Sequence, residues 1–243
     1  MKFKAALNYQ FSYQIRAFLI YSAIYITSAI IFPLIGLYFS NTTEVIKSDV
    51  LISPLVFMVI LMAVGSKIAF NLFVQNSTSR QTIFLSLLVS NGVIAIMTTV
   101  LNMLLITITN HFSNGSLQLY NFIGKIYRND PFFGIVATCF FVFFSAGLLG
   151  MLITTFSQRF LTTTKLLVSA GIVFLGIILS IVYQFCNEQL QQSFQTFVPR
   201  LFGFTGNQPQ VSSFMLTVVI VIILEAVFLY LMNRHREIKT KTA

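Results

Sequence analysis

The sequence predicts an all-α, polytopic integral membrane protein. Its 243 residues are 56% hydrophobic and only 9% charged, whereas soluble domains carry about 25% charged residues. Lipid must therefore cover much of the apolar surface. The apolar residues form runs long enough to cross a bilayer as helices, which takes roughly 20 residues each. Six spans are expected, at residues 17–37, 51–73, 83–106, 132–155, 166–183 and 213–232.

The segment before the first span, residues 1–16, has the pattern of an amphipathic helix. Its apolar residues recur at every fourth position and share one helical face, with polar residues opposite. The two sets are Phe3, Leu7, Phe11 and Ile15 against Asn8, Ser12 and Arg16. We expect an interfacial helix lying along the membrane, with a helical extension of the first span as the alternative. Residues 17–232 then form one membrane domain, and 233–243 a basic tail.

The basic residues predict the orientation. Ten of the fifteen fall with the two termini and the short loops 74–82 and 156–165. Four fall in the longer loops 38–50, 107–131 and 184–212. The positive-inside rule therefore favours cytoplasmic termini. The formal charge of +9 is scattered between apolar runs, so it does not indicate a nucleic-acid partner.

No motif for catalysis or cofactor binding is present. Gly124-Lys125 is not followed by the Ser or Thr of a phosphate-binding loop, and H-E-x-x-H and G-x-S-x-G are absent. Cys139 and Cys186 are too few for a disulfide framework or a zinc site. His111 and His235 lie in separate segments. We expect neither a metal, nor a cofactor, nor an enzymatic activity of this chain alone.

Two charged residues fall inside predicted spans, Lys67 in the second and Glu225 in the sixth. Charges at membrane depth are costly and often functional. Each lies about 10 Å from the cytoplasmic end of its helix, at 1.5 Å per residue, so the two are candidate partners. In the alternative, Lys67 extends to the interface and Glu225 is neutral or meets a hydroxyl group.

Small and hydroxyl-bearing residues are frequent in the third and fourth spans. Such residues allow close helix contacts and hydrogen bonds between helices. Packing within the chain is one interpretation, and a substrate path or a subunit interface is the other. The residues are Ser86, Ser90, Asn91, Thr98, Thr99 and Asn102 in the third span, and the run 145–151 in the fourth.

The loop 184–212 contains a candidate short helix. Leu190, Phe194, Phe197 and Val198 would share one helical face. A helix dipping back into the outer leaflet would satisfy its own backbone hydrogen bonds. A plain surface loop is the alternative.

The loop between the second and third spans reads Asn76-Ser77-Thr78-Ser79-Arg80 and continues into the third span as Gln81-Thr82-Ile83-Phe84. With the amphipathic N-terminus and the long loop before the last span, it resembles the membrane subunits of type-2 ABC exporters, the short six-span permeases of Gram-positive bacteria. That family often shows Asn-Gly-Val-Ser-Arg at this loop. Here Asn76, Ser79 and Arg80 match, and Ser77 replaces the glycine that would permit a tighter turn.

The resemblance implies a function and partners. In that family this loop forms a coupling helix that docks on a separate ATPase chain, a role that would fall to Asn76, Ser79 and Arg80. The chain would be a permease in the bacterial plasma membrane, paired with a second identical or different permease copy. It would export a hydrophobic or amphipathic cargo, such as an antimicrobial peptide. A stand-alone immunity or sensor protein without an ATPase is the alternative.

The predicted topology can be tested by labelling single cysteines. In a background lacking Cys139 and Cys186, cysteines at Ser116 and Gln208 should react with an impermeant reagent in intact cells. A cysteine at Ser77 should react only after permeabilisation, because the basic residues hold this loop in the cytoplasm. Labelling at Ser77 in intact cells, or none at Ser116, would reverse the orientation.

Overall fold

The computed structural model describes residues 2–40, 45–112, 117–160, 188–205 and 208–234, together with scattered positions from 163 to 183. Within these residues, five helices are long and apolar enough to cross a membrane. They are α1 (Lys2–Ser40), α2 (Ile52–Gln75), α3 (Arg80–Phe112), α5 (Phe132–Arg159) and α8 (Val211–Arg234). The prediction of a helical, multi-pass membrane protein is confirmed. The predicted span 166–183 lies largely outside the described residues, so the count of six stays a prediction.

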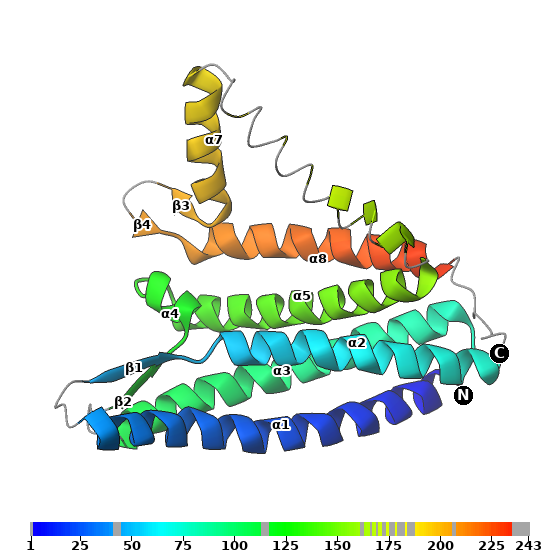
Figure 1. Ribbon diagram of the computed structural model, residues 1–243, viewed down its shortest axis with the longest axis horizontal. Coiled ribbons are helices and arrows are strands. Elements are labelled where there is room, and N and C mark those ends of the chain that lie inside the picture. The colour runs from blue at the N-terminus through cyan, green and yellow to red at the C-terminus, as the bar shows by residue number, and fades with distance from the viewer. Residues whose placement is uncertain are drawn as a thin grey trace.

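The long helices lie side by side and give the bundle two ends (Figure 1). One end, here called the turn end, holds the N-terminus of α1, residues 76–79 and the last residues of α5 and α8. The opposite end, the strand end, holds the short elements. Helix α5 is central, because it packs against α2, α3 and α8. Helix α1 covers α3 and part of α2, while α8 packs mainly on α5.

The strand end contains structure where the sequence predicted plain loops. Strands β1 (Ile46–Asp49) and β2 (Leu117–Tyr120) pair in parallel, and helix α4 (Phe122–Ile126) follows β2. The side chain of Asn110 donates to the carbonyl of Leu119 and accepts from its N–H, both at 2.9 Å. Strand β1 carries no alternation of apolar and polar residues, and in β2 the alternation of buried Leu117 and Leu119 with exposed Gln118 covers only four residues. Such short runs explain why the sequence did not reveal the strands.

The segment 184–212 contains the predicted short helix, α7 (Glu188–Leu201), followed by β3 (Phe204–Thr205) and β4 (Gln208–Pro209), which pair as an antiparallel hairpin. The helical alternative is therefore confirmed over the plain loop. Figure 1 shows α7 directed away from the bundle. Phe197 and Val198 are exposed.

A separate interfacial helix over residues 1–16 is not confirmed, because residues 2–40 form one continuous helix. This arrangement is the extension of the first span. The expected polar face is exposed at Asn8, Ser12 and Arg16. The buried face, however, is not the apolar stripe. It is formed by residues that follow one another every four positions, namely Ala6, Gln10, Gln14 and Phe18.

Two glycines of α5 let its backbone approach the neighbouring helices. A Cβ at Gly150 would lie 2.2 Å from the carbonyl oxygen of Val59 in α2. One at Gly147 would lie 1.9 Å from Oδ1 of Asn91 in α3. The Thr154 hydroxyl donates to the carbonyl of Ala63 at 2.8 Å. In lipid, close packing and such hydrogen bonds hold helices together, because apolar side chains gain little by leaving the surrounding tails.

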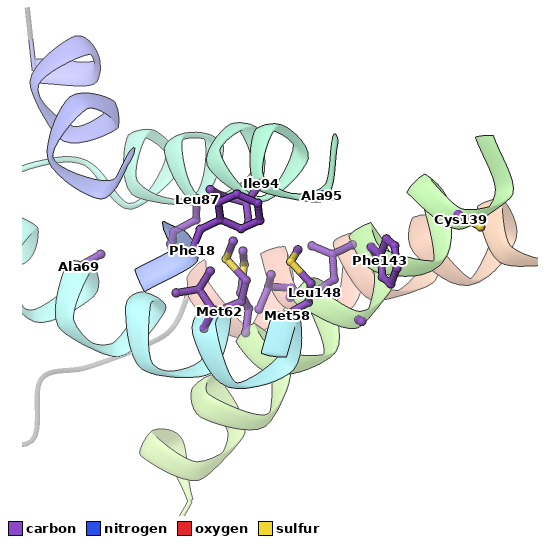
Figure 2. Packing of buried hydrophobic residues seen from close by; sticks show 14 of the residues in the cluster. Phe18, Met58, Met62, Ala69, Leu87, Ile94, Ala95, Cys139, Phe143 and Leu148 are labelled. Atoms are coloured by element: carbon purple, nitrogen blue, oxygen red, sulfur yellow. The ribbon is translucent and has the colours of Figure 1, made fainter. Parts of the chain in front are cut away.

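The apolar core lies between α2, α3 and α5 (Figure 2). Met58 and Met62 of α2 are completely buried, and so are Ile94 of α3 and Leu148 of α5. Unbranched methionine side chains fill irregular gaps between helices. Phe18 of α1 joins the same cluster, and its ring centre lies 6.3 Å from that of Phe57 in α2.

The start of α8 is attached to the turn between α4 and α5. The N–H of Val211 donates to Asp130 Oδ2 at 2.7 Å, a favourable position for a carboxylate at a helix N-terminus. The Tyr127 hydroxyl donates to the carbonyl of Phe202. Burial, followed by the nearby Asp130 carboxylate, raises the pKa of Tyr127 to about 12, so this donor keeps its proton at physiological pH.

The glycine contact in α5 gives a stability prediction. We expect Gly150→Ala to lower the free energy of unfolding by about 1–3 kcal/mol, because the methyl group would collide with the backbone of Val59 and the helices would have to separate. Gly171→Ala is the matched control, since a Cβ there meets no described atom within 4 Å. Unfolding by SDS titration measures both. Equal stability of the two variants would show that α2 and α5 are not in backbone contact.

Candidate functional site

The connection between α2 and α3 is a tight turn in which the backbone groups are hydrogen-bonded. The N–H of Thr78 donates to the carbonyl of Phe73 at 2.9 Å, and the N–H of Ser77 to that of Val74 at 3.0 Å. This pair of bonds is the Schellman motif that ends many helices. It requires a left-handed residue at the position of Ser77, where φ is 52°.

The first and last polar side chains of the turn stabilise its two helix ends. Asn76 donates from Nδ2 to the carbonyl of Leu72 at 2.9 Å. The Ser79 hydroxyl caps α3 by accepting the N–H of Thr82 at 3.2 Å, a contact typically worth about 1 kcal/mol. Both residues remain exposed. Two of the three predicted coupling residues therefore shape the turn.

The turn differs from the coupling helix that the resemblance implied. Residues 76–79 are not helical, and α3 begins directly at Arg80. The comparison at Ser77 is nevertheless informative. A glycine would be favoured at this position because it adopts positive φ without the penalty of a side chain. The resemblance expects a glycine at this position, and Ser77 adopts a positive φ.

Arg80 connects the turn to the last helix. Its Nη1 donates to the carbonyl of Arg234, the final residue of α8, at 2.6 Å. A guanidinium group at a helix C-terminus satisfies an unpaired carbonyl and interacts favourably with the helix dipole. A cavity of about 250 Å³ adjoins this contact, and Oδ1 of the buried Asn233 beside it has no hydrogen-bond partner among the described residues. The cavity is lined by Arg80, Gln81, Phe84, Tyr230, Asn233 and Arg234.

No protein-family model, curated protein or solved structure matches this chain. A function therefore has to be inferred from the chain's own residues. Among the described residues, no group of three or more His, Cys, Asp or Glu side chains is placed to hold a metal ion.

The two intramembrane charges are not joined in the structure. Glu225 is buried between α8 and α5, where the Ser145 hydroxyl approaches its two carboxylate oxygens at 2.9 and 3.1 Å. Lys67 is exposed on α2. The candidate ion pair is thus wrong, and the alternative in which Glu225 meets a hydroxyl group is confirmed. Matched depth did not ensure contact, because the helices present Lys67 to their surroundings and Glu225 to α5.

The polar residues of the third and fourth spans pack within the chain. All six named residues of α3 are buried, as are Ser145, Gly147 and Gly150 of α5. Asn91 donates to the carbonyl of Phe144 at 2.9 Å. The interpretation as intrachain packing is confirmed for these side chains, and none of them faces an open path.

Asn102, which the sequence analysis named, forms a buried network at the strand end with residues that it did not name. Asn102 donates to the Tyr25 hydroxyl at 2.9 Å and to the carbonyl of Val50 at 2.7 Å. It also accepts from Asn121 at 3.2 Å. The network joins α1, α3 and the segments before α2 and α4. A buried asparagine deep in an apolar run was the available signal, because such a group must find partners inside the bundle.

Glu225 gives a prediction about coupling between side chains. In a double-mutant cycle, Ser145→Ala and Glu225→Met should couple by about 1 kcal/mol of unfolding free energy, because either change alone leaves a polar partner unpaired. The cycle of Lys67→Met with Glu225→Met is the control and should be additive. SDS titration measures both cycles. Coupling in the lysine cycle alone would mean that Glu225 pairs with Lys67 in the membrane.

Proposed function

We propose that the chain is the membrane permease subunit of an ATP-driven exporter whose ATP is hydrolysed by a separate subunit. The observation that carries the proposal is the largely exposed turn at residues 76–79, whose first three backbone N–H groups are hydrogen-bonded to α2, with Arg80 beside it. This feature offers a partner protein a firm contact surface. Its sequence also carries the resemblance to type-2 ABC exporters, including the left-handed position at which those permeases have glycine.

The connections of the turn suit it to transmit movement. The Schellman bonds fix it to α2, and the Ser79 cap fixes it to α3. The bond from Arg80 to Arg234 extends the same unit to α8. A displacement imposed at the turn would therefore reach three helices of the bundle. The inner half of a transporter needs such a connection if a soluble ATPase is to drive it.

The remaining partners follow from the exposed helix faces. Helices α1 and α8 are the least buried of the five long helices and present large apolar side chains outward. Lipid covers part of this surface, and we propose that a second permease copy, identical or different, covers the rest. In this arrangement the turn end lies in the cytoplasm of a bacterial cell, and the chain crosses the plasma membrane.

The cargo assignment rests on the resemblance and on composition. A hydrophobic or amphipathic molecule, such as an antimicrobial peptide, is the expected export substrate. The alternative is a stand-alone membrane protein in which Arg80 only stabilises the end of α8. The two functions differ in whether the turn has an ATPase partner.

The test requires a candidate ATPase, sought among the genes that neighbour this chain's gene, and measures its coupling to the chain. We expect Arg80→Glu to lower co-purification and membrane-stimulated ATP hydrolysis by about tenfold, a loss of ~1.4 kcal/mol, because it reverses the charge offered to the partner and breaks the bond to Arg234. Arg80→Lys should lose less, since it keeps the charge and a donor but not the planar guanidinium.

Two controls separate coupling from folding and topology. Arg159→Glu removes the same charge from the turn end, at the exposed end of α5, and should leave coupling intact. Ser77→Gly keeps the backbone shape that the turn requires and should also remain active. Protease protection reports insertion. Full complex formation and full stimulated hydrolysis by a correctly inserted Arg80→Glu protein would mean that the turn only connects α2 and α3. Failure of the unaltered chain to co-purify with any ATPase would favour the stand-alone function.

A further inference from the structure

A second cavity lies at the strand end, on a different part of the bundle from the turn. Its volume is about 590 Å³, within the range of small-molecule sites. One part of its wall is apolar and comes from α3 and α5, with Met103, Ile106, Phe132 and Ile135. The other part is polar and comes from β1, β2 and α4. The cavity therefore spans the boundary between membrane-crossing helices and the polar cap above them.

Three cations stand around this cavity on three separate segments. Lys47 belongs to β1, Lys125 to α4, and Arg128 to the turn that follows α4. All three are exposed. The Lys125 ammonium lies 4.7 Å from the centre of the Tyr120 ring, a cation–π contact that holds it at the cavity wall.

Within the described chain, none of these cations forms an ion pair with an acidic side chain. The two nearest acids in sequence have other partners. Asp49 accepts the N–H of Leu51 at 2.8 Å, and Asp130 accepts the N–H of Val211 at 2.7 Å. Neither acid lines the cavity. Among the described residues, the cavity therefore combines three cations and no acidic lining residue with an apolar wall.

We propose that this cavity binds the phosphate group of an anionic phospholipid from the leaflet at the strand end. The three cations meet the phosphate, and the wall formed by Met103, Ile106 and Phe132 meets the upper part of an acyl chain. Basic pockets beside membrane helices recognise lipid headgroups in this way. A soluble phosphate compound would satisfy the cations only and would leave the apolar wall in contact with water.

The chain contains no tryptophan, so an introduced indole is a unique fluorescent reporter. Phe132 lines the cavity and is 62% exposed, so it can accept the larger ring. We expect the fluorescence of Phe132→Trp in nanodiscs to be quenched more strongly by brominated phosphatidylglycerol than by brominated phosphatidylcholine. Phe133→Trp is the matched control. The side chain of Phe133 is 84% exposed and does not line the cavity. A tryptophan at this position should therefore be quenched equally by both lipids.

The contribution of each cation is tested by substituting it in the Phe132→Trp protein. Each of Lys47→Gln, Lys125→Gln and Arg128→Gln should lower the preference for phosphatidylglycerol by up to about fivefold, the effect of one basic residue near an anionic leaflet. The triple variant should show no preference, while unchanged quenching of Phe133→Trp in that background confirms that the protein remains inserted.

Three outcomes would overturn the proposal. Equal quenching of Phe132→Trp by the two lipids would mean that the cavity does not select anionic lipid. A preference that persists in the triple variant would assign it to other residues. Loss of the preference on adding millimolar glycerol phosphate would show that the cavity takes soluble phosphate compounds instead of lipid.

Discussion

The bundle depends on the backbone contact between α2 and α5. At Gly150 the backbones of the two helices are so close that a Cβ atom would collide with the carbonyl oxygen of Val59. Because lipid tails compete equally well for apolar side chains, such short distances supply the dispersion energy that separates a packed bundle from independent helices. Helix α5 can then contact α2, α3 and α8 together.

Hydrogen bonds between polar side chains determine how the packed helices are positioned relative to one another. Asn102 and Asn121 place three hydrogen bonds at the strand end, where helix ends and strands must be fixed relative to one another. In the middle of the bundle, Ser145 supplies a partner to the buried Glu225. Hydrogen bonds that are satisfied inside an apolar environment select one arrangement of helices, because any other arrangement would leave the same groups unpaired.

The sequence was informative where a single physical rule dominated. Apolar runs located four of the spans closely, because a helix must cross a fixed thickness. The helix α7 was predictable because its apolar residues recur at helical spacing and share one face. The stripe of Phe3 and Leu7 misled, because periodicity shows which residues share a face but not which face a neighbouring helix covers. Gln10 and Gln14 are buried against α2 and α3, and only the tertiary contacts reveal this.

The candidate site was predictable in position but not in detail. A polar break between two apolar runs located the turn, but the left-handed conformation of Ser77 was not predicted. The bond from Arg80 to Arg234 joins residues 154 positions apart in the chain. The cavity at the strand end likewise depends on a parallel strand pair and on α4. No local pattern encodes such long-range neighbours, so both features required the structure.

Helix α8 is held at both ends, and this has a mechanical consequence. Asp130 accepts its first N–H and Arg80 donates to its last carbonyl. Its 24 residues span about 36 Å at 1.5 Å per residue, and a helix resists compression along its axis. Helix α8 is thus a strut between the two membrane surfaces. A displacement of Arg80 along this axis would therefore be carried to the strand end, where α7 contacts α8.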